Sequence, residues 1–529
     1  MPPSDYIRTR ELGGNGTAGQ YFSKVVDNHP YFPNLSVNAT DSMSVRHAAL
    51  VLVYSALLNN RQSKTSDDVN DDGESAEQKG KLKSKLNEFF DTAGGTRTSG
   101  MDQLSCTKVT GGITNALFRV SGFQTVKNLL VDNITTTTAA ATTNDNSDYL
   151  DFDSVLVRIF GAEGMIDRDI ETSTYAALCN ADIAYKYMGR FANGRIEGWL
   201  DGYHPLQLSD LSNEDVSLEI AKEMARLHCL FEVPEGELRE HHCGKSNTTS
   251  ASNNNELDVI TVGLWDQLNS WMEQAKGYTE FKTPADTERV RQLKLDQIEL
   301  EVQHMIQMIT TTPSPSSLDN NNETSSTTED SGDSTASICG STNNSSAKVV
   351  FCHNDLLPAN IMRHPTTGQI QLIDFEYGGS NYAAFDMANH FNEYAGGTTT
   401  KANGVTDYSN FPNQEQQTKF CVEYIKMARR LESMRSDITD PDYNGDDNLD
   451  VDQKMEESSE QDNDESIMAE ATALLSHVQK FIMVNHLYWG LWAVNQAAEE
   501  GCDEFDYLTY AANRLNEYYV KKAEWEKKS

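Results

Sequence analysis

The chain has 529 residues and a formal net charge of −37, from 80 acidic residues against 43 lysines and arginines. This acidic excess argues against a nucleic-acid-binding protein, which needs clustered basic residues to neutralise phosphates. The longest apolar run, Val45–Leu58, contains Arg46 and His47 and is too short to span a bilayer, so we expect no membrane insertion. The eight cysteines include no Cys-x-x-Cys pair and the N-terminus has no signal pattern, so we expect a cytoplasmic protein with reduced thiols.

Five polar segments reduce the hydrophobic fraction to 38% in a sequence that otherwise forms a core. They are rich in Ser, Thr, Asn, Asp or Glu and bury too little apolar surface to offset the entropy of ordering. We predict disordered insertions at about 63–79, 135–148, 244–255, 310–347 and 437–465. Without them roughly 350–400 residues remain, enough for one fold of two lobes. The last and most acidic insertion reads as a solvated loop or, alternatively, as a partner-binding segment.

An N-terminal lobe is predicted over residues 21–200, after a flexible stretch at 1–20. In chain order we expect a buried helix at Val45–Leu58 and a strand pair at Thr107–Thr110 and Ala116–Val120. A third strand at Val155–Phe160, a helix at Asp167–Asn180 and a last strand at Phe191–Leu200 follow. Because successive side chains of a strand alternate between its faces, Val157 and Arg158 lie on opposite sides of the sheet.

The loop over 111–115, Gly-Gly-Ile-Thr-Asn, is the candidate phosphate loop, because glycines let backbone N–H groups approach phosphates. Gly-Gly between strands is more often only a tight turn. Arg158 supports the functional interpretation, since a guanidinium binds phosphate oxygens bidentately. Glu171, on the following helix, is its expected partner, although a lone Arg–Glu pair is commonly a surface bridge. The predicted ATP-binding residues are Gly111, Gly112, Thr114, Asn115, Arg158 and Glu171.

Residues 201–529 are predicted to form a larger, mainly helical lobe. Apolar residues recur at helical spacing in Val216–Phe231, Ile260–Gln274, Ile467–Glu499 and Phe505–Tyr519. The exception is Val349–Gly396, where two short apolar runs flank Arg363–Gln369, a stretch with the Pro and Gly of a turn. This pattern predicts a strand hairpin.

The two runs of the hairpin end in polar side chains. The first is followed by His-Asn-Asp355 and, five residues further on, Asn360, and the second ends in Asp374-Phe-Glu. Because the turn is centred near Thr367, the hairpin brings Asn360 and Asp374 to the same open end, close to Asp355. An amide oxygen beside carboxylates is a hard ligand set suited to Mg²⁺. We predict Asn360 and Asp374 as metal ligands, and Asp355 as the group that orients or deprotonates an attacking hydroxyl.

Such a site suits phosphoryl transfer, which depends on positioning and on neutralising charge. The spacing His-x-Asp-x-x-x-x-Asn followed by Asp-Phe-x matches the catalytic loop and the metal-binding Asp of protein kinases. A polar loop that resembles this pattern by chance is the alternative. With a small mixed lobe ahead of a larger helical one, the motif predicts an α+β, two-lobed protein-kinase-like fold that uses ATP and Mg²⁺.

Two later features concern the acceptor. Asp386–Tyr394 follows the metal-binding Asp closely enough to line the same cleft, although it also reads as a polar helix start without a ligand. The spacing Trp-x-x-Trp puts two tryptophans on one helix face, which is more often core but can form an aromatic wall for a cation, worth roughly 0.5–2 kcal/mol. The predicted acceptor-binding residues are Asp355, Glu376, Tyr377, Glu393, Tyr394, Trp489 and Trp492.

Taken in order, these motifs resemble the choline/ethanolamine kinase family. They cover most of the predicted folded part, as Gly-Gly-Ile-Thr-Asn at 111–115, Val-Arg-Ile-Phe-Gly at 157–161, His-Asn-Asp-Leu-Leu at 353–357, Ile-Asp-Phe-Glu-Tyr at 373–377, Asn-His-Phe-Asn-Glu at 389–393 and His-Leu-Tyr-Trp-Gly-Leu-Trp at 486–492. The resemblance implies an ATP- and Mg²⁺-dependent kinase for a small amino alcohol, at the entry to the CDP-ethanolamine or CDP-choline route to phospholipids, and a homodimer. The long insertions, above all 310–347, depart from the family pattern.

The resemblance is stronger to the ethanolamine kinases of that family. They typically carry Leu at the position of Leu357 and Asn at that of Asn392, where choline kinases more often have Gln and Cys. A primary ammonium also donates directly to a carboxylate such as Glu393, whereas choline benefits from a full aromatic cage. We therefore predict ethanolamine as the substrate and choline as a weaker one. The first alternative is a choline kinase or a dual choline/ethanolamine kinase. The others are a phosphotransferase of the same fold for antibiotics or sugars, and a non-catalytic scaffold that binds nucleotide or partners.

Overall fold

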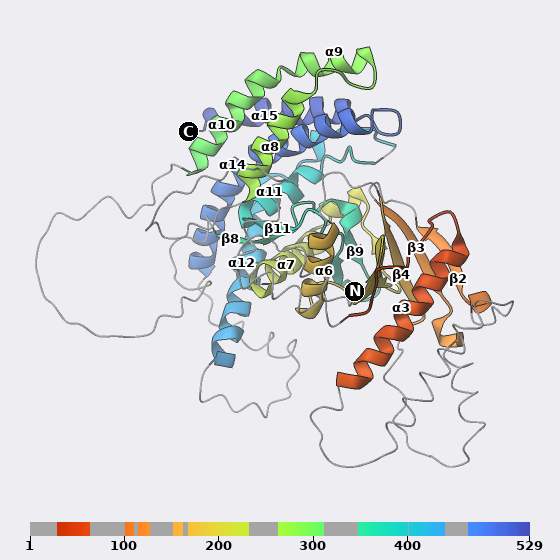
Figure 1. Ribbon diagram of the computed structural model, residues 1–529. Coiled ribbons are helices and arrows are strands. Elements are labelled where there is room, and N and C mark those ends of the chain that lie inside the picture. The colour runs from red at the N-terminus through yellow and green to blue at the C-terminus, as the bar shows by residue number, and fades with distance from the viewer. Residues whose placement is uncertain are drawn as a thin grey trace, which may run out of the picture. The chain divides into compact units, whose positions relative to one another are not determined.

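This computed structural model describes residues 29–63, 101–109, 115–126, 152–161, 168–231, 263–310, 348–399, 401–439 and 464–528 (Figure 1). The five predicted insertions fall outside these ranges, apart from a few of their end residues, which belong to helices. The chain divides into two compact units, Met1–Tyr203 and His204–Ser529.

The first unit is built on a six-stranded sheet of order β1-β5-β6-β4-β3-β2. Its strands are β1 Tyr31–Phe32, β2 Ser105–Val109, β3 Asn115–Ser121, β4 Ser154–Phe160, β5 Tyr187–Phe191 and β6 Gly194–Gly198. β1 runs parallel to β5, and the other described pairs are antiparallel. The helices α3 (Ser42–Ser63) and α6 (Arg168–Asn180) belong to the same unit. The predicted strand pair, the third strand and both helices are confirmed.

β4 shows how alternation in the sequence separates the two faces of this sheet. Val155 and Val157 are fully buried and belong to one apolar cluster with Leu50 of α3 and Val120 of β3. Arg158 points to the other face because neighbouring side chains of a strand alternate. It is only 3% exposed there. A guanidinium buried in this way needs charged or polar partners around it.

The predicted single strand over Phe191–Leu200 is wrong at its beginning. β5 already ends at Phe191, the chain turns, and β6 begins at Gly194 and pairs back onto β5. The Asn193 side chain holds this turn, accepting from the Val37 N–H at 2.8 Å and donating to the Val37 carbonyl at 2.9 Å. A side chain at Gly194 would clash with the Arg158 carbonyl oxygen, so the turn depends on glycine there.

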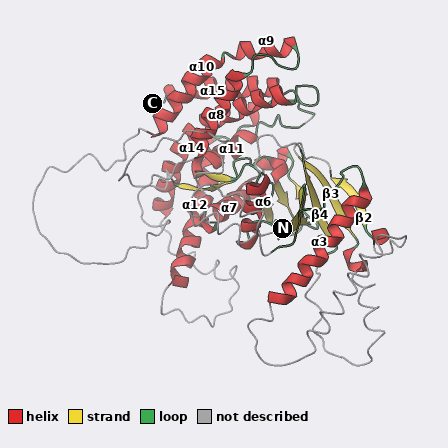
Figure 2. Cartoon of the chain, viewed as in Figure 1, coloured by secondary structure: helices red, strands yellow, loops and turns green. Residues whose placement is uncertain are grey.

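The second unit consists mainly of helices (Figure 2). They are α7 Glu214–Leu230, α8 Gly263–Gly277, α9 Pro284–Leu293, α10 Leu295–Thr310, α11 Ala383–Glu393, α12 Gln414–Thr439, α14 Asp464–Glu499 and α15 Tyr507–Glu526. α14 is the central helix, because α8, α11, α12 and α15 all pack against it. The four predicted helices of this lobe are confirmed as α7, α8, α14 and α15.

Two small sheets carry the chain segments that lead to the polar motifs. β8 Val349–Cys352 pairs with β11 Gly379–Tyr382, and β9 Ile361–Arg363 lies between β7 His204–Pro205 and β10 Ile370–Leu372. With the mixed sheet of the first unit and the helices of the second, the predicted α+β class is confirmed. None of the helices in the described part of the chain combines the length and apolarity needed to cross a membrane.

Candidate active site

The first apolar run, Val349–Cys352, is β8 and pairs with β11, so it is not an arm of the predicted hairpin. The hairpin across the turn at 363–369 is formed by β9 and β10, which pair in antiparallel register. The ladder continues beyond the strands, since the Ile373 N–H donates to the Asn360 carbonyl at 3.0 Å. Asn360 and Asp374 therefore meet at the open end of the hairpin. The Asn360 amide turns towards Asp355, with Nδ2 at 2.9 Å from its backbone oxygen and 3.0 Å from its Oδ2. The pKa of the Asp355 carboxyl is raised most by burial, then by two other carboxylates, and then by the charge of Asp374.

The loop after β8 is fastened to α11 through its backbone. Asp386 accepts from the His353 N–H at 2.8 Å and from the Asn354 N–H at 2.7 Å. Asn389, one turn later on α11, accepts from the Leu356 N–H at 2.6 Å. Asn354 itself has a φ of 65°, a left-handed conformation that Asn adopts more readily than most residues. Buried acceptors on one helix thus fix the backbone on both sides of Asp355.

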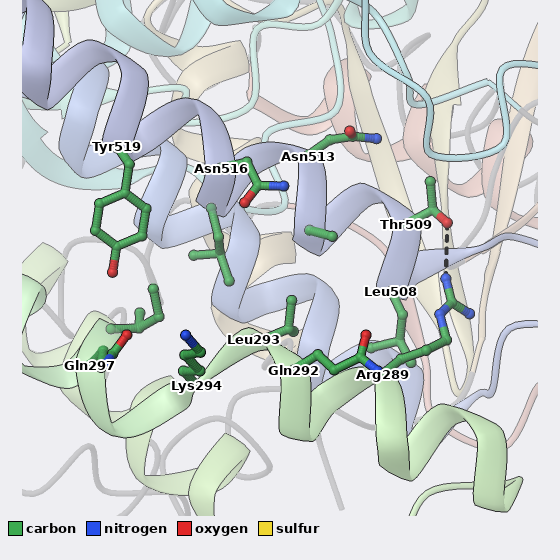
Figure 3. A pocket seen from close by; sticks show the side chains of 13 residues that line it. Arg289, Gln292, Leu293, Lys294, Gln297, Leu508, Thr509, Asn513, Asn516 and Tyr519 are labelled. Atoms are coloured by element: carbon green, nitrogen blue, oxygen red, sulfur yellow. Dashed lines mark hydrogen bonds between the residues drawn. The ribbon is translucent and has the colours of Figure 1, made fainter.

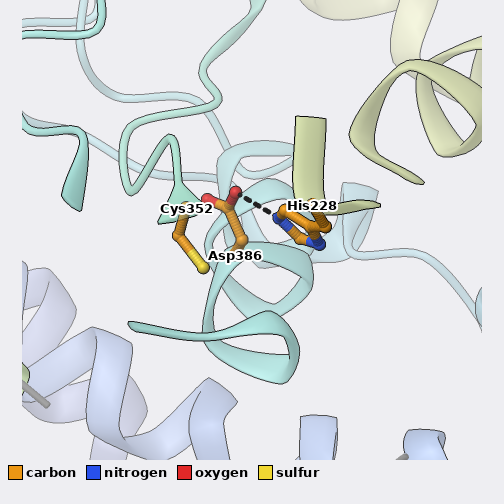
Figure 4. A group of neighbouring side chains, drawn as sticks. All are labelled: His228, Cys352 and Asp386. Atoms are coloured by element: carbon orange, nitrogen blue, oxygen red, sulfur yellow. Dashed lines mark hydrogen bonds and ion pairs between the residues drawn. The ribbon is translucent and has the colours of Figure 1, made fainter. Parts of the chain in front are cut away.

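His228, Cys352 and Asp386 lie close enough together to be considered as metal ligands, with ligand atoms within 4.8 Å of one another (Figure 4). Hydrogen bonds already engage these atoms. His228 Nε2 lies 3.0 Å from Asp386 Oδ2, its Nδ1 lies 3.0 Å from the Tyr424 hydroxyl, and Cys352 Sγ lies 3.4 Å from a backbone carbonyl. Burial alone would raise the pKa of Asp386, but the hydrogen bond and charge of His228 hold it below its usual value. This cluster therefore anchors the loop.

The Asp355 carboxylate lies in a concentration of negative charge. Burial raises its pKa well above the usual value, and the charges of Glu393, Glu376 and Asp374 raise it further, while the Asn360 hydrogen bond opposes them. Carboxylates gathered in this way around Asp355 attract cations. Both a divalent metal ion and an ammonium group fit that requirement.

The donor set of the hairpin end fits Mg²⁺. The Asn360 side chain donates to Asp355 through its amide nitrogen in two hydrogen bonds, which turns Oδ1 away from that residue. Asp374 is half-buried and has a φ of 65°, so the chain bends sharply where it presents this carboxylate. An amide oxygen with a carboxylate is hard oxygen ligation, and Mg²⁺ commonly takes one or two carboxylates together with substrate phosphates.

Aromatic side chains gather around Tyr377, which directly follows Glu376. Trp492 Nε1 donates to the Tyr377 hydroxyl at 3.1 Å, and the Trp489 ring lies edge-on to both, with centroids 5.2 Å from each. Two further tyrosines, Tyr488 and Tyr510, have pKa values raised by burial and also by the charge of Asp355. The predicted Trp489–Trp492 pair therefore lies near the carboxylates around Asp355. Tyr488 and Tyr510 belong to the same aromatic group.

Glu393, the last residue of α11, is only 2% exposed and pairs with Arg514 of α15, with Arg514 Nη1 at 3.2 Å from Oε1. Its other oxygen, Oε2, is buried without a hydrogen-bond partner among the residues that the structure describes. Burial raises the pKa of Glu393, against the charge of Arg514. Tyr394 turns its hydroxyl to Ser217 of α7, at 3.3 Å.

The first unit holds a cluster of three arginines and two glutamates, all of them buried except Arg168, which is partly exposed. Glu197 Oε1 accepts from Arg158 Nε at 2.8 Å and from Arg195 Nε at 2.7 Å. Glu171 pairs with Arg195 and with Arg168, each at 2.8 Å. Burial would raise the pKa of Glu171, but Arg195, Arg158 and Arg168 lower it to about 2. Three positive charges against two negative ones leave a net positive charge, which favours an anion.

The sequence anticipates only part of this cluster. Glu171 is the expected partner of Arg158, and the charge of Arg158 does act on it, but Arg158 also binds Glu197, which the sequence analysis missed along with Arg195. The signal was the Arg-x-Glu pattern in an otherwise buried strand, which puts two charges on one face. Asn115 begins β3 and is buried. The predicted phosphate-loop residues Gly111, Gly112 and Thr114 lie outside the described residues.

A cavity of about 480 Å³ lies elsewhere in the second unit, between α9, the start of α10 and α15 (Figure 3). Arg289 crosses one end of it and donates to the Thr509 hydroxyl at 2.9 Å, while Lys294, Asn513 and Tyr519 line the rest with further amide and apolar side chains. Its lining contains none of the predicted catalytic or acceptor-binding residues.

Comparisons with known proteins identify a family and relatives of the chain. The family model described as Choline/ethanolamine kinase matches residues 106–519. Ethanolamine kinase 1 of Mus musculus is 27% identical over 398 residues, which is 75% of this chain and 84% of that protein. Probable choline kinase 2 of Arabidopsis thaliana is 28% identical over 370 residues, covering 70% and 77%.

A solved structure of a Plasmodium vivax ethanolamine kinase shares the fold, with a TM-score of 0.52 at 21% identity over 81% of this chain and 85% of that one. The family model covers more than half of the sequence and includes the β8–β10 motif, α11 and α14. The chain therefore belongs to the choline/ethanolamine kinase family.

Proposed function

We propose that the protein catalyses the ATP- and Mg²⁺-dependent phosphorylation of ethanolamine to phosphoethanolamine, the first step of the CDP-ethanolamine route. One observation carries the choice of substrate. The buried Glu393 carboxylate keeps one oxygen without a partner in the described part of the chain. Its charge acts on Asp355, the predicted acceptor of the hydroxyl proton. A primary ammonium at Glu393 and a hydroxyl at Asp355 are the two ends of an amino alcohol.

The hydroxyl end of the substrate is assigned to Asp355. A positioned carboxylate orients the attacking hydroxyl and accepts its proton as the bond to phosphorus forms. The raised pKa of Asp355 makes it a better proton acceptor than an ordinary aspartate once it is ionised. Its loop is held by Asp386 and Asn389, which supports a fixed direction of attack.

The ammonium end is assigned to Glu393 and the aromatic group. A charged N–H donor at Glu393 Oε2 forms a short, charge-assisted hydrogen bond and satisfies the buried oxygen. The faces of Trp489, Trp492 and Tyr377 add cation–π attraction of roughly 0.5–2 kcal/mol.

Phosphate binding is assigned to the Arg158 cluster of the first unit, and Mg²⁺ binding is assigned separately to Asn360 and Asp374 of the second unit. The net positive charge around Arg158 supports binding of phosphate oxygens. Asn360 and Asp374 would hold Mg²⁺, which when bound neutralises charge on the transferred phosphoryl group.

Choline is the second candidate substrate, and the aromatic group favours it. A quaternary ammonium donates no N–H and is recognised by aromatic faces, which Tyr377, Trp489 and Trp492 supply. Relatives of the chain carry both names.

The test is ADP release and product mass with purified full-length protein and Mg-ATP. Ethanolamine, choline and ethylene glycol are compared at matched concentrations, because ethylene glycol offers a hydroxyl of similar reach without an ammonium. We expect the highest kcat/KM with ethanolamine and negligible turnover with ethylene glycol. A higher kcat/KM with choline would refute the substrate assignment, and turnover with none of the three would refute the proposed function.

A further inference from the structure

Three buried polar residues behind Glu393 form a continuous hydrogen-bonded chain. Arg514 Nη1 lies 3.2 Å from Glu393 Oε1, and its Nη2 donates to Asn485 Oδ1 at 2.6 Å. Asn392 Nδ2 donates to the same Asn485 oxygen at 2.9 Å. These residues come from α15, α14 and α11, and Asn392, Asn485 and Arg514 are fully buried. These hydrogen bonds therefore connect three helices to the Glu393 carboxylate.

The orientation of each amide in this chain follows from Arg514. A guanidinium has only donors, so Asn485 must present its oxygen to it. Asn392 must then present its amide nitrogen to that oxygen, and the same nitrogen also donates to the Ile482 carbonyl at 3.2 Å. Reversing either amide would set two donors or two acceptors against each other. The hydrogen bonds thus select one arrangement of all three side chains.

The backbone around Arg514 is held as closely as its side chain. A Cβ at Gly490 of α14 would lie 2.8 Å from Leu515 Cδ2 and 3.7 Å from Arg514 Cβ, so glycine allows α14 and α15 to approach at this point. The Arg514 guanidinium carbon also lies 5.5 Å from the centre of the Tyr510 ring. These contacts fix the backbone of Arg514, so its guanidinium can change its pairing with Glu393 only by rotating about the side-chain bonds.

The consequence is an incomplete pairing of Glu393. A free guanidinium would take both oxygens of a carboxylate in a two-pronged contact. Here Nη2 is engaged by Asn485, Nη1 reaches Oε1, and Oε2 is left buried with no partner among the described residues. A buried acceptor left unsatisfied is unfavourable unless a ligand fills it.

We propose that Asn392, Asn485 and Arg514 are positioning residues that keep Glu393 Oε2 available for an N–H donor of a primary ammonium. This inference rests on the proposed function and deepens it. Ethanolamine supplies such a donor and choline does not. Loss of the hydrogen bonds among these residues frees Arg514 to take both oxygens of Glu393. That removes the acceptor for ethanolamine and leaves the aromatic contacts of choline intact.

The first test is the Asn485→Ala variant of the full-length protein. We expect ethanolamine kcat/KM to fall by at least about tenfold, mainly through KM, because a hydrogen bond to a charged group is lost. Choline kcat/KM and the KM for ATP should change much less. The control is Asn495→Ala, on the same helix and equally buried, where the amide donates to the Trp271 carbonyl at 3.0 Å. That variant should leave the ethanolamine-to-choline ratio unchanged.

Arg514→Lys gives an independent reading should Asn485→Ala fail to fold, since lysine keeps the charge but lacks the second arm of the fork. Arg514→Lys should also lower the ratio of ethanolamine kcat/KM to choline kcat/KM. An equal loss with both substrates, an unchanged ratio in the variants, or an effect confined to the KM for ATP would overturn the inference while the proposed function stands. An unaltered protein that phosphorylates neither amino alcohol would overturn both.

Discussion

The Asp386→Asn substitution tests whether α11 holds the loop that carries Asp355. Asp386 Oδ1 accepts from the Asn354 N–H at 2.7 Å, and Oδ2 accepts from the His353 N–H at 2.8 Å and from His228 at 3.0 Å. An amide of the same shape has one oxygen, so its nitrogen must face at least one of these N–H donors. The variant keeps the volume of the side chain and removes one acceptor and the charge.

The size of the effect follows from these contacts. A hydrogen bond to a charged group contributes roughly 1.5–3 kcal/mol, and the orphaned donor adds its own desolvation cost, so we expect a loss of roughly 2–4 kcal/mol. At about 2–4 °C per kcal/mol for a domain of some 150–250 residues, the unfolding midpoint should fall by roughly 4–16 °C. A shift of Asp355 by about 1 Å would lower kcat by about a hundredfold.

The assay combines kcat for the amino alcohol with thermal unfolding followed by circular dichroism. The matched control is Asp286→Asn at the start of α9, where the carboxylate accepts from Thr283 Oγ1 at 2.6 Å and pairs with Arg289. This control should lose stability and keep kcat. The reasoning is refuted if Asp386→Asn turns over at the unaltered rate below its unfolding midpoint, or if both variants lose kcat equally.

Three further substitutions test the remaining assignments. Asp355→Asn should lower kcat by about a hundredfold or more, and an unchanged kcat removes Asp355 from the mechanism. The same variant should raise the unfolding midpoint at pH 7, because a carboxyl whose folded-state pKa is raised weakens the fold as pH rises through that pKa. Glu197→Gln leaves Arg158 with a weaker partner and should change the KM for ATP but not for ethanolamine, whereas Asp201→Asn, an exposed control, should change neither; equal effects on both KM values would count against nucleotide binding there. Asp374→Asn should raise the Mg²⁺ concentration for half-maximal rate by about tenfold or more, and an unaltered Mg²⁺ titration would exclude it as a ligand.

The hairpin and its polar residues could be predicted because their geometry is local. Turn residues at 363–369 fix which residues lie opposite each other, so the spacing of Asn360 and Asp374 already implies their meeting. The helices α7, α8, α14 and α15 were predicted from apolar periodicity. Helix α9 was not predicted, although the sequence carries two signals for its start, the capping residue Thr283 and Pro284 in the first turn.

The pairing of buried charges could not be predicted in the same way. Glu393 and Arg514 are 121 residues apart, and only the packing of α11 and α15 against α14 brings them together. Glu197 likewise binds Arg158 across 39 residues because β4 and β6 are neighbours, an order that the missed turn after Phe191 concealed. Long-range partners depend on the topology, and spacing in the sequence carries no record of it.

α11 connects the two ends of the acceptor site through one rigid element. Asp386 and Asn389 hold the loop around Asp355, and Asn392 and Glu393 lie at the other end of the same helix. Residues at i, i+3 and i+7 share a helix face, and seven residues span about 10 Å. Every residue of α11 is buried, so the helix has no room to tilt independently of its neighbours. The separation between the hydroxyl-binding and the ammonium-binding carboxylates is therefore set by a helix, and an acceptor whose two groups are spaced differently must either leave Asp355 or leave Glu393.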